Sequence, residues 1–273
     1  ESGGQPALAP SVRGSVLILS RDPTGCRDVQ AAIDKAAADP EELRLLADEL
    51  RGHVAQVARC PHANHVLQKL LQLARPEDMR FVVDEILGRP GLVSQAARHR
   101  YGCRIVQLLL QRLPPDAVNG LMEALLADAA MLACHPFGNY VMQRLIECGS
   151  ERQRCRAIFA LRESRWRCGQ STAGCAVLSV AFAHGAPEDR SALARDIAEE
   201  PELLLNMALD RVGNKAVLRL LRELAGEDLS RTQAALVERA GTLRCSRFGR
   251  AVARNLGLME EDAEEALEEA ACT

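Results

Sequence analysis

The sequence predicts an all-α protein, built as a curved α-solenoid of about seven helical repeats. Its 273 residues are 48% hydrophobic but only 3% aromatic, and Leu and Ala dominate, as in stacked helices. A small residue followed by an apolar helical pattern also returns seven times, at Gly25, Ala63, Gly102, Gly138, Gly174, Gly213 and Gly249. The intervals are 38, 39, 36, 36, 39 and 36 residues, and so regular a period is the signature of a repeat architecture.

The segment from His135 to Glu147 illustrates the helix that follows each small residue. Its apolar side chains share one face, at Val141, Met142, Leu145 and Ile146. Asn139 and Gln143 lie one turn apart on a different face, with Tyr140 beside them. Two amides and an aromatic ring are suited to holding a flat heteroaromatic group, because amides bond its edge and a ring stacks on its face.

Each unit carries a second helical pattern, with Asp and Glu on its polar side, as in residues 79–87 and 119–132. Breakers such as Gly88–Gly91 and Pro114–Pro115 separate the patterns. No unit could bury its apolar face alone, so neighbouring units must stack. The small residue at each motif suits a tight helix entry and close packing against the preceding unit.

These patterns predict three parts of the chain. Residues 1–14 are expected to be a flexible tail, residues 15–257 the repeat domain, and residues 258–273 an acidic capping helix or tail. No apolar run is long enough to cross a membrane, and residues 5–10 do not resemble a signal peptide. The ten cysteines are scattered through helical patterns, which indicates reduced thiols in an intracellular protein rather than a disulfide-linked secreted one.

Alignment on the small residue turns single residues into columns. The first column contains Cys26, Asn64, Cys103, Asn139, Cys175, Asn214 and Arg250. The second contains Arg27, His65, Arg104, Tyr140, Ala176, Lys215 and Ala251. The third, one turn after the first, contains Gln30, Gln68, Gln107, Gln143, Ser179, Leu218 and Arg254. In the first four units the second column is always a flat side chain that can stack on a base, which is worth roughly 1–3 kcal/mol per base.

These columns resemble those of the Pumilio (PUF) family of RNA-binding repeat proteins, over about residues 15–257. The resemblance is carried by Gly138–Gln143, Gly102–Gln107, Asn64–Gln68 and Gly25–Gln30. It implies that each repeat binds one base through the first and third columns, with the second column stacking between bases. Asn with Gln implies uracil, Cys with Gln implies adenine, and the RNA runs antiparallel to the protein. The implied sequence for the first four units is 5′-UAUA-3′.

The last three units depart from the family pattern. The fifth has Ala176 and Ser179 where a stacking residue and a Gln are expected, and the sixth has Leu218 in the third column. In the seventh, Arg250 and Arg254 fit phosphates better than base edges. The family usually has eight repeats. We therefore expect weaker or less specific RNA contacts from Cys175, Ser179, Asn214, Lys215, Arg250 and Arg254.

Charge placement agrees with RNA binding although the formal net charge is −3. Segments 61–73, 101–113, 136–146, 211–222 and 243–256 contain no Asp or Glu. They carry basic residues, whereas acids concentrate in the other helices. A repeat protein with one basic and one acidic surface can attract phosphate locally. A simpler interpretation is that acids merely favour exposed outer helices.

Other chemistries fit less well. Cys60, His62 and His65 could suggest zinc, but the second column accounts for His65 and no fourth ligand is close. No catalytic or cofactor-binding motif is present, so neither an enzyme nor a cofactor is predicted. The predicted function is sequence-specific binding of single-stranded RNA by a cytoplasmic monomer that regulates mRNA post-transcriptionally, with repressor or deadenylase partners on its outer surface. The alternatives are a protein-binding armadillo or HEAT-like scaffold, or a divergent PUF-type protein that binds structured RNA in ribosome assembly.

Overall fold

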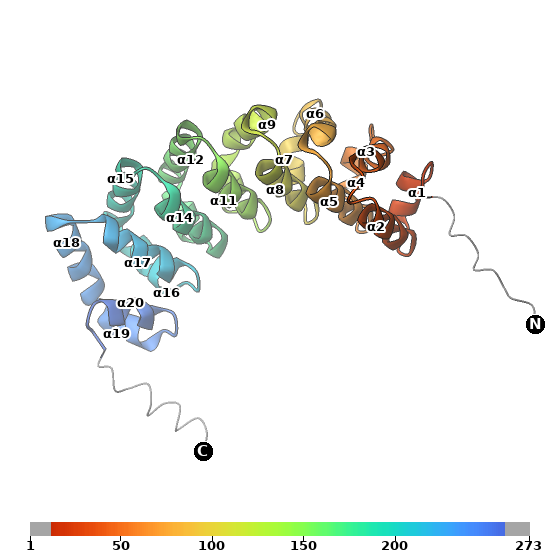
Figure 1. The fold of residues 1–273 in the computed structure, drawn as a ribbon. Helices are drawn as coiled ribbons and strands as arrows, with labels where there is room; N and C mark the ends of the chain where they lie inside the picture. The colour runs from red at the N-terminus through yellow and green to blue at the C-terminus, as the bar shows by residue number, and fades with distance from the viewer. Residues whose placement is uncertain (1–11, 260–273) are drawn as a thin grey trace, which may run out of the picture. The chain divides into compact units, whose positions relative to one another are not determined.

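The computed structural model describes residues 12–259, and within that range the regular elements are all helical (Figure 1). Each repeat contains a motif helix that begins at or just before the repeated small residue. The motif helices are α2 (Gly25–Lys35), α5 (Ala63–Leu73), α8 (Gly102–Arg112), α11 (Gly138–Cys148), α14 (Thr172–His184), α17 (Gly213–Glu223) and α20 (Gly249–Asn255). The predicted all-α repeat architecture is confirmed.

A shorter helix, here called the entry helix, precedes each motif helix. The entry helices are α1 (Val16–Arg21), α4 (Val54–Val57), α7 (Leu92–Ala97), α10 (Ala129–Ala133), α13 (Arg165–Gly169), α16 (Pro201–Leu209) and α19 (Ala240–Cys245). An outer helix follows the first six motif helices. The outer helices are α3 (Pro40–Asp48), α6 (Arg80–Leu87, after the 3₁₀ turn η1, Pro76–Met79), α9 (Pro115–Ala127), α12 (Glu151–Glu163), α15 (Pro187–Ala198) and α18 (Gly226–Val237).

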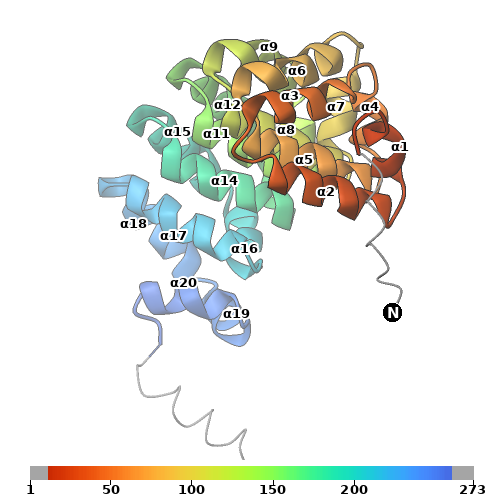
Figure 2. The same ribbon diagram turned by 45° about the vertical axis from the view of Figure 1, so that its right-hand side comes forward.

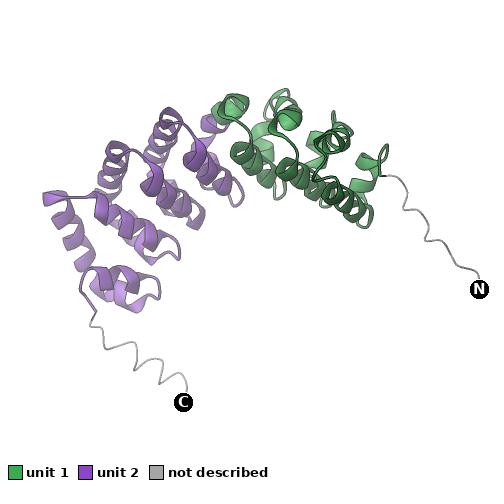
Figure 3. Cartoon of the chain, in the orientation of Figure 1, with its two compact units in different colours: residues 1–124 green, residues 125–273 purple. Residues whose placement is uncertain are grey.

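The chain divides into two compact units, residues 1–124 and 125–273, with the boundary inside α9 (Figure 3). In the first unit α2, α5 and α8 pack side by side, and α3, α6 and α9 lie on the opposite side (Figures 1 and 2). In the second unit α11, α14, α17 and α20 pack in succession, and α12, α15 and α18 form the other layer. Each unit therefore exposes one layer of motif helices.

The apolar face of each motif helix forms the core between the two layers. In α11 the side chains of Val141, Met142, Leu145 and Ile146 are fully buried, as the sequence predicted. The same four positions are buried in α5, at Val66, Leu67, Leu70 and Leu71. Burying each such side chain contributes about 1.5–3 kcal/mol, so the motif helices are held firmly enough to present polar groups at fixed positions.

The small residue at each motif start is required by contact with the entry helix. A Cβ added to Gly138 would lie 2.9 Å from the carbonyl oxygen of Leu132, and one added to Gly102 would lie 2.7 Å from that of Ala96. Leu132 and Ala96 belong to the entry helices of the same repeats. The predicted tight helix entry is confirmed by these contacts within the repeat. Close packing against the preceding unit is also present at Gly213, where an added Cβ would lie 3.0 Å from Sγ of Cys175 in the preceding motif helix.

The predicted two-helix unit is also corrected to three helices. The pattern over residues 119–132 is divided between α9, which ends at Ala127, and α10, which begins at Ala129. The residue between them, Asp128, is neither Gly nor Pro. The apolar pattern therefore runs on without a helix-breaking residue, and the sequence predicted one helix where there are two. The predicted tail (1–14) and acidic cap (258–273) fall almost wholly outside the described residues.

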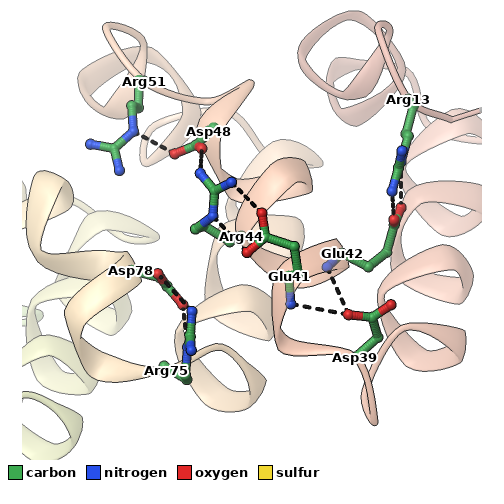
Figure 4. A network of polar contacts seen from close by, with 9 residues as sticks. All are labelled: Arg13, Asp39, Glu41, Glu42, Arg44, Asp48, Arg51, Arg75 and Asp78. Atoms are coloured by element: carbon green, nitrogen blue, oxygen red, sulfur yellow. Dashed lines mark hydrogen bonds and ion pairs between the residues drawn. The ribbon is translucent and has the colours of Figure 1, made fainter.

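Polar side chains form a network of contacts along α3, with a separate pair at η1, in the outer layer of the first unit (Figure 4). Asp39 caps α3 by accepting the backbone N–H groups of Glu41 and Glu42, each at 3.1 Å. Arg44 bonds to Glu41 and pairs with Asp48 at 2.7 Å, and the hydrogen bond from Arg44 lowers the pKa of Glu41. These pairs are exposed and screened by solvent, so the network orients the acids more than it stabilises the fold.

No helix in residues 12–259 combines the length and the hydropathy that crossing a membrane requires.

Candidate nucleic-acid interface

A column of hydrogen-bond acceptors, three residues before the small residue, starts each motif helix. Its members are Asp22, Cys60, His99, His135, Ser171, Asp210 and Ser246. Asp210 Oδ1 accepts the backbone N–H groups of Val212 and Gly213, both at 2.8 Å. His135 Nδ1 accepts those of Phe137 and Gly138 at 3.1 and 3.2 Å. These bonds satisfy N–H groups that a helix start leaves unpaired.

This capping column was not predicted from the sequence, although the repeat alignment contains it. Its seven members include carboxylate, hydroxyl, imidazole and thiol groups, so no residue type repeats often enough to be noticed. What they share is an acceptor atom at one distance from the helix. Cys60, considered above as a metal ligand, belongs to this column, since its Sγ accepts the N–H of Ala63 at 3.4 Å.

The imidazole cap of the third repeat makes stability depend on pH. Burial, and then the charges of Arg59 and Arg100, lower the pKa of His99, whose Nδ1 accepts N–H groups of Tyr101 and Gly102. A lowered folded pKa means that its contribution is present above the unfolded pKa of about 6.5 and is lost as pH falls. Urea unfolding at pH 7.5 and 5.5 should show this loss in the parent protein.

His99→Asn is the matched variant for that measurement, because an Asn oxygen can cap the helix without titrating. We expect its loss of stability between pH 7.5 and 5.5 to be smaller than that of the parent. An equal loss in both proteins would show that His99 is not the responsible group.

The first column lies at the edge of the core and not on an open surface. Its first six side chains, Cys26, Asn64, Cys103, Asn139, Cys175 and Asn214, are 7% exposed or less. Asn139 Nδ2 donates to the backbone carbonyl groups of His135 and Pro136, both at 2.9 Å. Asn64 and Asn214 make the same pair of bonds to the turn before them. The amide orientation is thereby fixed, and Oδ1 is the atom that remains for other partners.

The third column meets the first in each of the first four repeats. Gln68 and Gln143 donate Nε2 to the Oδ1 of Asn64 and Asn139, at 2.7 and 2.9 Å. The other two pairs use the backbone, with Gln30 donating to the carbonyl of Cys26 at 3.1 Å and Gln107 to that of Cys103 at 3.0 Å. All four glutamines are half-buried. The structure thus brings together each predicted edge-contacting pair.

The second column is exposed where the sequence places a stacking residue. Arg27, His65, Arg104, Tyr140 and Lys215 are all exposed, and Tyr140 is 46% exposed. Ala176 and Ala251 are half-buried and have no flat group. Each of the first four motif helices therefore presents a flat exposed side chain directly after a buried polar or thiol side chain.

In the fifth repeat the side chains of the first and third columns are buried and bonded within the protein. Ser179 is 7% exposed, and Arg219 of the next motif helix donates to both its hydroxyl and its carbonyl oxygen, the latter at 2.8 Å. Cys175 Sγ donates to the carbonyl of Gly169 at 3.4 Å, and burial raises the pKa of this thiol to about 12. The departure from the pattern is thus structural as well as chemical.

Several basic residues on motif helices are engaged within the protein. Lys69 pairs with Asp34, and Arg144 pairs with Glu147 at 2.8 Å. Arg112 donates to the carbonyl oxygen of Gln72 at 2.8 Å. The basic residues of the motif layer therefore partly serve to join neighbouring repeats.

The column residues of the last two repeats differ in exposure. Asn214 is buried, Lys215 and Arg254 are exposed, and Leu218 and Arg250 are half-buried.

The fold and the repeated pair define a class: α-helical repeat proteins that present a buried polar or thiol side chain, a Gln and an exposed flat side chain on successive motif helices, here on the first four. A family model, the Pumilio-family RNA-binding repeat, matches residues 15–51, 53–87, 93–126 and 129–160. These ranges are the first four repeats, and they cover about half of the chain. The chain belongs to the Pumilio family of RNA-binding repeat proteins, and the resemblance found in the sequence is confirmed.

Curated relatives include the Pumilio homology domain family member 4 of Saccharomyces cerevisiae, 34% identical over 114 residues, which are 42% of this chain and 12% of that protein. The putative pumilio homolog 7, chloroplastic, of Arabidopsis thaliana is 26% identical over 207 residues, 76% of this chain and 31% of the relative. This chain therefore spans less than a third of the length of these two relatives.

Solved structures share the fold. The crystal structure of PUF-8 in complex with PBE-RNA has a TM-score of 0.77 at 20% identity, covering 91% of this chain and 73% of the other. The Puf4 RNA binding domain, bound to the HO endonuclease RNA 3′ UTR recognition sequence, has a TM-score of 0.72 at 20% identity, covering 88% and 73%.

Proposed function

We propose that this protein binds single-stranded RNA sequence-specifically, one base per repeat, with 5′-UAUA-3′ recognised by the first four repeats. The observation that supports it best is the alternation of Cys–Gln and Asn–Gln pairs over those repeats, each beside an exposed flat side chain. One base per helical repeat, contacted by two or three side chains, is the recognition mode of this repeat class.

The Asn–Gln pair suits uracil. Asn139 Nδ2 is held by two backbone carbonyl groups, so Oδ1 is an acceptor for the N3–H of uracil. Gln143 Nε2, now bonded to that Oδ1, can turn to donate to a uracil carbonyl oxygen. Adenine has an acceptor at its ring N1, which would face the fixed Asn139 acceptor unfavourably. The same reasoning applies to Asn64 and Gln68.

The Cys–Gln pair suits adenine. Cys103 Sγ donates to the carbonyl of Arg100 at 3.6 Å and is a small, weak acceptor towards the base. The amide of Gln107 then supplies a donor for adenine N1 and an acceptor for the N6 amino group. Cys26 also donates backwards, to the carbonyl of Pro23 at 3.3 Å, so the first and third repeats share this chemistry.

Selection from a random RNA pool tests the base preference. We expect enriched sequences to share UAUA, with the strongest preference in these four positions and weaker preference 5′ of them. A single oligonucleotide with UAUA replaced by CCCC should lose the specific part of the affinity. An enriched pool without this core, or equal binding of the two oligonucleotides, would refute the assignment.

Tyr140→Ala should weaken binding of UAUA RNA by about 1–3 kcal/mol, roughly 5- to 150-fold, because it removes a stacking surface. Phe159→Ala is the matched control, since Phe159 is a 58% exposed aromatic residue on outer helix α12 of the same repeat. We expect its affinity to equal that of the parent in fluorescence anisotropy titrations at fixed salt. Equal losses in both variants would argue against stacking at Tyr140.

We further propose that the protein acts as a monomer in post-transcriptional regulation of mRNA in the cytoplasm. Repressor or deadenylase partners would bind the outer helices, which carry the network of Figure 4 in the first unit. Support for this step comes from family membership. Loss of a reporter mRNA's repression on mutating UAUA in its 3′ UTR is the observation expected in cells.

A further inference from the structure

Two thiols meet between the entry helices of the fourth and fifth repeats. Cys134 directly follows α10, and Cys168 lies in α13. Their Sγ atoms are 3.6 Å apart, although 33 residues separate them in the chain. Cys134 is half-buried and Cys168 is fully buried. One residue of the pair is thus partly exposed to solvent, and the other is buried but within reach of the first.

The surroundings make the two thiols unequal. The hydrogen bond with Cys168 lowers the pKa of Cys134 to about 7, with further help from Ser171 and the charge of Arg167, against the effect of burial. The same hydrogen bond and burial raise the pKa of Cys168. Near neutral pH a substantial fraction of Cys134 is therefore thiolate, beside a neutral Cys168 thiol. A thiolate with an adjacent second thiol is the arrangement found in redox-reactive cysteines.

We propose that Cys134 and Cys168 form a peroxide-reactive thiol pair that closes to a disulfide between the entry helices of repeats four and five. The inference rests on the distance and the burial of these two sulfurs, and it holds whether or not the RNA assignment above is correct.

The reaction needs one molecule of a hydroperoxide. The Cys134 thiolate attacks the peroxide oxygen, the O–O bond breaks, and the departing hydroxide or alkoxide takes a proton, leaving Cys134 as a sulfenic acid. Cys168 then attacks the Cys134 sulfur and its proton leaves with the departing hydroxide as water. In sum two thiols are oxidised by two electrons, and hydrogen peroxide is reduced to two waters.

Other described cysteines lack this arrangement. Cys26, Cys103 and Cys175 are buried and donate to backbone carbonyl groups of their own repeats. Cys155 is an exposed residue whose Sγ donates to Asp189 Oδ1 at 3.6 Å. Partial desolvation of the thiol and the charge of Asp189 raise its pKa, which favours the protonated thiol at neutral pH. It therefore serves as a control thiol.

The disulfide would form beside two motif helices. Cys134 is followed by His135, which caps α11. Cys168 lies three residues before Ser171, whose Oγ caps α14 by accepting the N–H of Gly174 at 2.9 Å. A disulfide would therefore link the turns that carry the capping residues of α11 and α14. The thiol pair therefore lies between the fourth repeat, which has all three predicted RNA-contacting residues, and the fifth repeat, where Cys175 and Ser179 are buried.

The test is peptide mapping of the full chain after treatment with one equivalent of hydrogen peroxide and alkylation of the remaining thiols. We expect a cross-linked peptide joining Cys134 to Cys168, reversed by dithiothreitol. Cys155→Ser should form this cross-link to the same extent. In Cys168→Ser, a dimedone adduct should accumulate on Cys134, because the resolving thiol is absent.

Two results would overturn the proposal. One is oxidation of exposed thiols such as Cys148 or Cys245 while Cys134 stays fully alkylated. The other is the same yield of dimedone adduct on Cys134 in the parent and in Cys168→Ser, which would show that Cys168 does not resolve the sulfenic acid. Circular dichroism of Cys168→Ser establishes that the variant is folded before either result is interpreted.

Discussion

Replacing Asn139 by Ser together with Gln143 by Glu should change the preferred RNA from UAUA to GAUA. A Glu carboxylate accepts from both the N1–H and the N2 amino group of guanine, whereas uracil would face it with a carbonyl oxygen. A good bidentate contact is worth about 1–3 kcal/mol of discrimination, so the preference should shift by roughly 5- to 150-fold at that base. Competition titrations with the two RNAs measure the shift.

The second repeat supplies a matched control for this change. Asn64 and Gln68 hold the same geometry, with Nε2 to Oδ1 at 2.7 Å. Asn64→Ser with Gln68→Glu should therefore favour UAGA, which moves the guanine by two positions. If both double variants favour the same RNA, or neither departs from UAUA, the assignment of one base to each repeat is wrong.

Gly174→Ala should be the most destabilising of the small substitutions at a motif start. The added Cβ would lie 2.2 Å from the carbonyl oxygen and 2.5 Å from the Cα of Cys168. These are backbone atoms, so α13 and α14 must move apart to accommodate it. Overpacking of this kind costs typically about 1–3 kcal/mol, and we expect the urea midpoint to fall accordingly.

Gly241→Ala is the control for that measurement. Gly241 lies in α19 with no atom within 4 Å of the position its Cβ would take. Gly to Ala inside a helix stabilises by about 0.5–1 kcal/mol, so this variant should unfold at the same or a higher urea concentration than the parent. If Gly174→Ala unfolded at the same urea concentration as Gly241→Ala, the contact between the added Cβ and the backbone of Cys168 would be relieved at no cost in stability.

The features that could be predicted from the sequence are those that return at the same position in each repeat. Seven motif helices, their apolar faces and the pairing of Asn139 with Gln143 all follow from residue spacing along a helix, because the i to i+4 relation is local. The entry helices were missed because they are short, from four to nine residues, and carry too little periodicity to separate from their neighbours.

Features that depend on distant contacts were not predictable in this way. The closure of Ser179 by Arg219 joins residues forty positions apart on neighbouring helices. Burial of the first column depends on how entry and motif helices pack, which residue spacing does not specify. The capping column was missed for a different reason, since it conserves an acceptor atom and not a residue type.

The bonds from Asn139 Nδ2 to the carbonyl groups of His135 and Pro136 have a consequence for pyrimidine choice. Uracil and cytosine have nearly the same shape, and at N3 they differ by one proton. A freely rotating amide could serve either base by turning over. Here a turned amide would put Oδ1 against two carbonyl oxygens, so the backbone opposes the exchange. On the proposed function, rejection of cytosine at the uracil positions therefore depends on the two backbone carbonyl groups that hold the Asn139 amide in one orientation.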